Sequence, residues 1–135
     1  MSDEHIYADR FLGEFRELKH GRSDGPPLHA SVRSKGDRHE ENLVHYLRSG
    51  SVLAATGSAV YDVLSPTNEL IDALHLLTDG EWFWHTDLAH YVERYHVPLD
   101  DRFVDHAPLQ GWSPPQLSED ELIRIADVFF PEDED

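Results

Sequence analysis

Residues 76–96 read LLTDGEWFWHTDLAHYVERYH and combine the strongest turn signal in the chain with its clearest helical pattern. Asp79-Gly80 is typical of a two-residue hairpin turn, and the run EWFWH after it has the composition of a strand. Beyond that run, apolar residues recur at the spacing of one helix face, namely Leu88, Tyr91, Val92 and Tyr95. The stretch therefore predicts a β-hairpin followed directly by a helix over residues 85–96.

The predicted hairpin also assigns side chains to the two faces of the sheet. A two-residue turn pairs Thr78 with Glu81, and the register continues outward from that pair. One face then carries His75, Leu77, Trp82 and Trp84, and the other carries Leu74, Leu76, Phe83 and His85. Two tryptophans beside a histidine form either a wall of the core or, where they are exposed, an aromatic anchor for a partner. We favour the core wall.

A second hairpin is predicted upstream of this one. Residues 52–56 and 59–64 are both rich in strand-forming residues, and the Gly-Ser pair at 57–58 between them suits a type II′ turn. Residues 65–78 are ambiguous, because their apolar spacing fits a helix as well as a strand. We favour a strand over residues 73–78, preceded by a loop or a helical turn.

The remaining helices are predicted from apolar spacing and from residues that begin or end a helix. They cover residues 3–20, 39–49, 99–111 and 118–130. The last has the most complete start, because Ser118 and Glu121 can form a capping box. Residues 21–38 contain three glycines and a Pro-Pro pair, which predicts a flexible loop.

These elements predict an α+β fold in one domain, residues 1–135. Its antiparallel sheet has about four strands from two hairpins, packed by about three to five helices, including those at the N-terminus, at 86–96 and at 118–130. A chain of 135 residues is long enough for one substantial core. Residues 131–135 read PEDED and form an acidic C-terminal tail.

Charge is the strongest global property of the chain. It has 27 acidic and 11 basic residues, a net charge of −16 with histidine neutral. Such a field repels nucleic acid and anionic membranes and attracts cationic partners, although acidity can also serve solubility alone. The chain has no cysteine, no apolar run long enough to span a membrane and no secretory signal, so we expect a cytoplasmic protein.

Ten histidines call for a test of metal binding. The string HEENLVH is not a zincin motif, because Leu43 stands where the second histidine is required. His90 and Glu93 share a helix face with Asp87 and are weak candidates for metal ligands. They lie opposite the apolar stripe, and a solvated face explains them more simply. We therefore predict no metal site and no cofactor.

Catalytic motifs are missing from the sequence. It contains no thiol nucleophile, no Gly-x-Ser-x-Gly elbow and no glycine-rich phosphate loop. We predict no catalytic residue. The alternative is a metal-dependent or small-molecule-binding enzyme that uses His75, His85, His90 and nearby carboxylates.

The run TDGEWFWHTDLAHYVERYHVPLDDRFVDHA resembles a segment of small, acidic, uncharacterised actinobacterial proteins. In those proteins a strand ending in Asp-Gly-x-Trp-x-Trp leads into a helix with Asp-Leu-Ala and Tyr-Val. This resemblance implies a shared turn and core stripe but no activity. In type, the chain is also similar to the immunity proteins of polymorphic toxins, which are small, acidic, cysteine-free α+β domains that block a toxin.

The function expected from these features is non-enzymatic protein binding. The acidic chain would neutralise a basic partner, such as a nuclease toxin, by occluding it as an immunity or inhibitor protein does. Carboxylates would mimic phosphates and aromatic side chains would anchor the contact. The residues expected at the partner are Trp82, Trp84, His75, Glu81 and Asp79.

Overall fold

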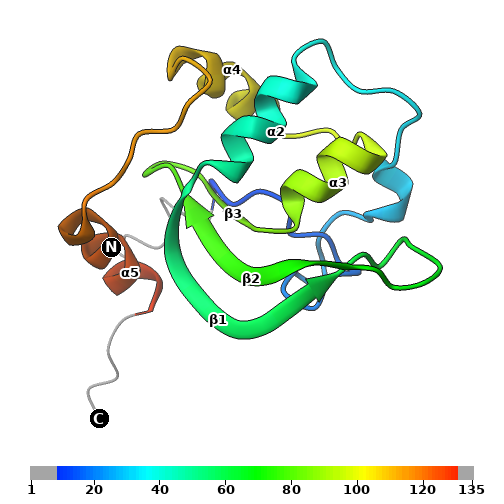
Figure 1. Cartoon of the computed structure of the whole chain (residues 1–135), viewed down its shortest axis with the longest axis horizontal. Helices are drawn as coiled ribbons and strands as arrows, with labels where there is room; N and C mark the ends of the chain where they lie inside the picture. The colour runs from blue at the N-terminus through cyan, green and yellow to red at the C-terminus, as the bar shows by residue number, and fades with distance from the viewer. Residues whose placement is uncertain (1–8, 131–135) are drawn as a thin grey trace.

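The computed structural model describes residues 9–130, which form an α+β fold with an open, three-stranded antiparallel sheet (Figure 1). The strands, in spatial order, are β1 (Ser51–Tyr61), β2 (Leu70–Thr78) and β3 (Phe83–His85). The helices are α2 (Glu40–Arg48), α3 (Leu88–Tyr95), α4 (Asp101–Leu109) and α5 (Glu119–Phe129), with a short 3-10 turn, η1 (His29–Ser31). The predicted fold class is confirmed, but the sheet has three strands rather than about four. The predicted acidic tail at 131–135 lies outside the described residues.

The predicted hairpin with a turn at 57–58 is wrong, because β1 runs through that position as one strand. β1 pairs along its length with β2, and the chain reverses between them at residues 62–69. The register shifts between Ala55 and Ala59, so residues 56–58 form a bulge. Pairing with β2 provides backbone hydrogen bonds for the parts of β1 before and after the bulge. A hairpin within residues 52–64 would instead leave β2 with β3 as its single partner strand.

The hairpin between β2 and β3 is real but has a longer loop than predicted. Thr78 pairs with Phe83 and Leu77 with Trp84, two positions further along than the expected register. The loop is held by Asp79, whose Oδ1 accepts hydrogen bonds from the backbone N–H groups of Glu81 (2.9 Å) and Trp82 (2.7 Å). Because the shift is an even number of residues, side chains on paired strand positions keep their predicted faces.

The helix predicted over residues 3–20 is wrong for its described part, since residues 9–20 contain no helix. This N-terminal segment instead lies against the free edge of β3. The N–H of Leu12 donates to the carbonyl of Phe83 (2.8 Å), and the N–H of Phe83 donates to the carbonyl of Arg10 (3.0 Å). Gly13 then has φ +76°. An unpaired strand edge gains more from these backbone bonds than the segment gains from a surface helix.

The other helices lie close to their predicted positions. On α3, Leu88, Tyr91 and Val92 are buried, as the apolar stripe predicts. α5 begins with the predicted capping box of Ser118 and Glu121. Residues 21–38 contain η1 as their regular element, and their predicted flexibility stays a prediction.

The core lies between one face of the sheet and the helices α2, α3 and α4. α2 and α3 pack together over this face, whereas α5 lies apart from them beside β1 (Figure 1). On the other face, the ring of Phe129 from α5 packs against Phe83 at 4.6 Å between centroids, and Phe11 of the N-terminal segment lies beside both. α5 has no buried residue, so it contributes little to the core.

Candidate functional site

The two tryptophans expected at a partner lie in the core. Trp84 is 0% exposed and Trp82 is 2% exposed. The indole N–H of Trp84 donates to the carbonyl of Leu47 in α2 (2.8 Å). The guanidinium groups of Arg10 and Arg102 lie 5.2 and 5.3 Å from the centroid of the Trp82 ring. The favoured core-wall interpretation is correct, and these rings are not available as surface anchors.

Asp79 is also buried, at the centre of a polar network. Its Oδ2 accepts hydrogen bonds from the hydroxyl of Tyr46 (2.6 Å) and from Nε2 of His106 (2.9 Å). Burial and the nearby carboxylate raise the pKa of the Tyr46 phenol above its ordinary range. Glu81 is exposed and lies 3.7 Å from Nδ1 of His106, while His75 is half-buried on β2. Of the five expected partner residues, Glu81 is therefore exposed, His75 is half-buried and the other three are buried.

A similar network surrounds Asp62, which follows directly after β1 and is fully buried. Its Oδ2 accepts from Nε2 of His90 (2.7 Å) and from the hydroxyl of Tyr95 (2.8 Å), and Oδ1 accepts from the N–H of Leu64 (2.8 Å). Burial acts to raise the pKa of Asp62, but the bonds from His90 and Tyr95 outweigh it and hold that pKa below its usual value. The solvated position predicted for His90 is thus wrong, because its ring binds a buried carboxylate.

Pairing of histidine with carboxylate recurs through the fold. Among residues 9–130 the four shortest pairs are His20–Asp87, His90–Asp62, His96–Glu40 and His106–Asp79, with N–O distances of 2.7 to 2.9 Å. Each joins two distant segments, and Asp62, Asp79 and Asp87 are buried. Buried carboxylates require such partners, so these histidines have a structural role. The high histidine content of the sequence is consistent with this structural role. It does not indicate which carboxylates the histidines contact.

The structure does not bring together the candidate metal ligands His90 and Glu93, or the histidines His75, His85 and His90 of the alternative enzyme hypothesis. Glu93 is exposed and pairs with Arg48 (2.9 Å). His90 is engaged by Asp62, and the ring of His85 lies 4.2 Å from that of His20. Among residues 9–130, no three histidine, aspartate or glutamate side chains converge as ligands for a metal.

His85 predicts a measurable pH dependence of stability. Burial, followed by the neighbouring His20, lowers its pKa from 6.5 to about 4. His85 thus stays neutral in the fold while the unfolded chain takes up a proton. Stability contributed by this residue is present above pH 6.5 and is lost as the pH falls towards about 4. We expect His85→Gln to reduce the acid-dependent loss by up to about 3 kcal/mol, measured by urea unfolding across this pH range.

The matched control is His45→Gln, at an exposed position on α2. We expect the pH dependence of this variant to follow that of the wild type. An unchanged pH dependence in His85→Gln would contradict the assignment of a half-buried histidine that stays neutral in the fold.

Unpaired acidic side chains gather on the later helices. Among residues 9–130, five arginines form ion pairs with acids of the same chain, namely Arg22, Arg33, Arg48, Arg94 and Arg102. Within residues 9–130, the exposed acids on α4 and α5 without an ion pair include Asp101, Asp105, Glu119, Asp120 and Asp127. α5 also exposes apolar surface, since Ile123 is 52% exposed and Phe130, directly after the helix, is 56% exposed.

Comparisons with known proteins find no matching family model, curated protein or solved structure. In the described part of the chain, no helix has the length and apolar character needed to cross a membrane.

Proposed function

We propose that this protein is a non-enzymatic protein-binding domain that occludes a basic partner, as an immunity or inhibitor protein does for a nuclease toxin. The observation that carries the proposal is the outer face of α5, defined here by Asp120, Ile123 and Asp127. These residues recur at i, i+3 and i+7, so they are neighbours on one side of the helix. Ile123 is half-exposed between two carboxylates that have no ion pair among residues 9–130.

An apolar contact with a charged rim is the composition expected of a binding surface. In this proposal α5 provides that binding surface, and the buried tryptophans do not. The charge extends beyond the helix, because residues 118–135 contain eight acids and a single arginine, Arg124. Carboxylates on this surface would occupy positions that the partner uses for phosphates, and attraction between opposite charges would speed association.

The turn before β3 adjoins the same surface. A hollow of about 490 Å³ lies between this turn and α5, lined by Gly80, Leu117, Glu121, Arg124, Asp127 and neighbouring residues. Glu81 directly follows Gly80 in the chain and is exposed. Of the partner residues expected from the sequence, Glu81 thus remains a candidate, as part of the rim of this surface.

The test is capture of partners from the host at low salt, with the full-length protein as bait and mass spectrometry as the readout. We expect a basic protein that is released as salt is raised, because exposed charge pairs are screened. The double variant D120K/D127K should slow association on the order of tenfold or more. If the captured protein is a nuclease, its activity should be blocked at equimolar inhibitor.

The matched control is D101K/D105K, which makes the same charge change on the exposed face of α4. We expect this variant to bind more like the wild type than D120K/D127K does. Equal losses in the two variants would show that net charge, rather than the outer face of α5, drives binding. Recovery of no basic protein at low salt would refute the proposed function itself.

A further inference from the structure

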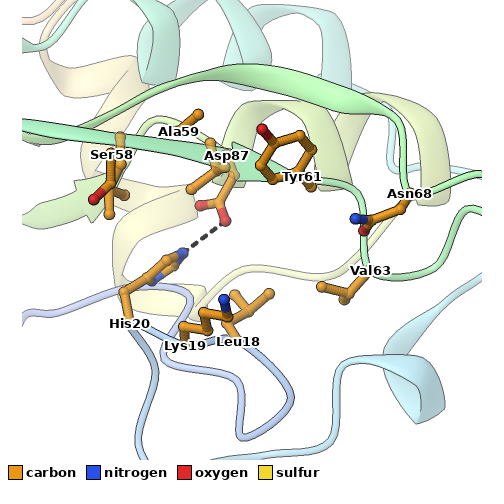
Figure 2. Close-up of a pocket in the computed structure, with 11 residues that line it drawn as sticks. Leu18, Lys19, His20, Ser58, Ala59, Tyr61, Val63, Asn68 and Asp87 are labelled. Atoms are coloured by element: carbon orange, nitrogen blue, oxygen red, sulfur yellow. Dashed lines mark hydrogen bonds and ion pairs between the residues drawn. The ribbon is translucent and has the colours of Figure 1, made fainter.

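A pocket of about 500 Å³ lies on elements that the acidic surface does not use. Its floor and walls come from the N-terminal segment around His20, from β1 at the end of its bulge and beyond, and from the loop that follows β1 (Figure 2). Apolar side chains line much of it, including Leu18, Val60, Val63 and Leu74. This volume lies within the range of about 300–1,000 Å³ that is typical of sites for small organic molecules.

The bulge in β1 helps to form this pocket. The hydroxyl of Thr56 donates to the carbonyl of Leu74 on β2 (2.8 Å) and accepts from the N–H of Ser58 (3.1 Å). A bulge bends its strand and redirects the side chains that follow. Ser58, the last of the bulged residues, and Ala59 and Val60, which follow it, line the pocket.

The pocket differs in charge from the rest of the molecule. Asp87 is the single carboxylate among its lining residues, and it is buried and bonded to Nε2 of His20 at 2.7 Å (Figure 2). Lys19, one of two lysines in the chain, is also in the lining. In a protein of net charge −16 this pocket therefore presents a cation and no unpaired carboxylate. Its local charge favours a neutral or anionic ligand over a cation.

His20 adds an unmet polar group beside the same wall. An ionised carboxylate can only accept, so Nε2 of His20 carries the proton that bonds Asp87. Nδ1 of His20 is buried and has no hydrogen-bond partner among residues 9–130. Buried polar atoms are almost always bonded, so an unbonded one calls for an explanation such as a bound water or ligand. In the neutral ring this Nδ1 is an acceptor, so it would accept from a donor group and not from the anionic group of a ligand.

We propose that this pocket binds a small organic anion with a mostly apolar body. The anionic group would lie beside Lys19 and the apolar body against Leu18, Val60 and Leu74. Binding to this site is independent of the proposed partner surface, because α5 contributes no residue to its lining.

The test uses two probes that share an aromatic body and differ in charge. The anionic probe is 8-anilinonaphthalene-1-sulfonate, and the neutral probe is N-phenyl-1-naphthylamine. Each is titrated into the folded, full-length protein at neutral pH and physiological salt, with fluorescence as the readout. We expect saturable binding of one equivalent of the anionic probe, and weaker binding of the neutral probe. Amide chemical-shift changes in NMR spectra should cluster at residues 18–20 and 58–63.

Two lysine variants separate local recognition from net charge. Lys19→Glu should weaken binding of the anionic probe about tenfold or more and change binding of the neutral probe less than about twofold. Lys35→Glu is the matched control, because it makes the same charge change at an exposed position outside the pocket lining. Equal losses for the two variants would overturn recognition of the anionic group by Lys19.

A third variant tests the location. Ala59 is an exposed lining residue, so Ala59→Trp should fill the pocket and abolish binding of both probes. Ser58→Trp, at the neighbouring exposed position, provides a second blocking variant if the first does not fold. Undiminished binding in a folded blocking variant, shift changes outside the pocket, or no saturable binding to the wild type would each overturn the proposal.

Discussion

Replacing Asp79 with alanine should lower the free energy of unfolding by about 3–5 kcal/mol, the largest loss we expect from any single carboxylate. Its side chain is 0% exposed and accepts four hydrogen bonds. Two come from the backbone N–H groups of Glu81 and Trp82, and two come from Tyr46 and His106. Alanine would leave these donors without their acceptor, and the loop that determines the register of β3 would lose its support.

The measurement is equilibrium unfolding in urea at neutral pH. Asp72→Ala is the matched control, because Asp72 is exposed on β2 and, among residues 9–130, its side chain accepts one hydrogen bond, from the N–H of its neighbour Ala73 (2.7 Å). We expect this control to change stability by less than about 1 kcal/mol. The loss of stability for Asp79→Asn should lie between those of the two alanine variants. The amide keeps one acceptor oxygen, but its NH₂ group would face donors that now bond a carboxylate oxygen. A loss of less than about 1 kcal/mol for Asp79→Ala would show that the network contributes little net stability.

Replacing Trp84 with alanine should cost a similar amount, about 3–5 kcal/mol, through loss of core packing. The ring lies between β3 and α2, with Phe103 of α4 at 5.8 Å between centroids. Its fit is close, because a Cβ placed on Gly50 would come within 2.7 Å of Cζ2 of Trp84. A side chain at position 50 would therefore need the space that the Trp84 ring occupies.

Trp112→Ala is the control for the third tryptophan, which is half-buried and lies 5.2 Å from the ring of His39. We expect it to cost less than half as much as Trp84→Ala in the same urea titration. Thermal unfolding should rank the two variants in the same order. A small loss of stability for Trp84→Ala would support the interpretation of this ring as a surface anchor. The large loss that we expect agrees with its burial.

Local patterns were sufficient for much of the helical structure. The spans of α2 and α3, the buried stripe of α3 and the capping box of Ser118 and Glu121 all follow from residues within a few positions of one another. Propensity, capping and helical spacing act over that range, so the sequence alone contains them. The face on which Leu77 and Trp84 meet was also predictable, because an even shift of register preserves it.

Tertiary contacts decided the rest. The stretch around 57–58 had the residues of a turn, yet it became a bulge because β2 supplied a longer partner strand. The N-terminal segment had a helical apolar pattern, yet its described part binds the open edge of β3. The histidine–carboxylate pairs join residues 27 to 67 positions apart. The backbone groups at a strand edge and the oxygens of a buried carboxylate need hydrogen-bond partners, and the tertiary structure decides which groups lie close enough to provide them. The free energy of these hydrogen bonds outweighed the weak local preference for a turn or a helix.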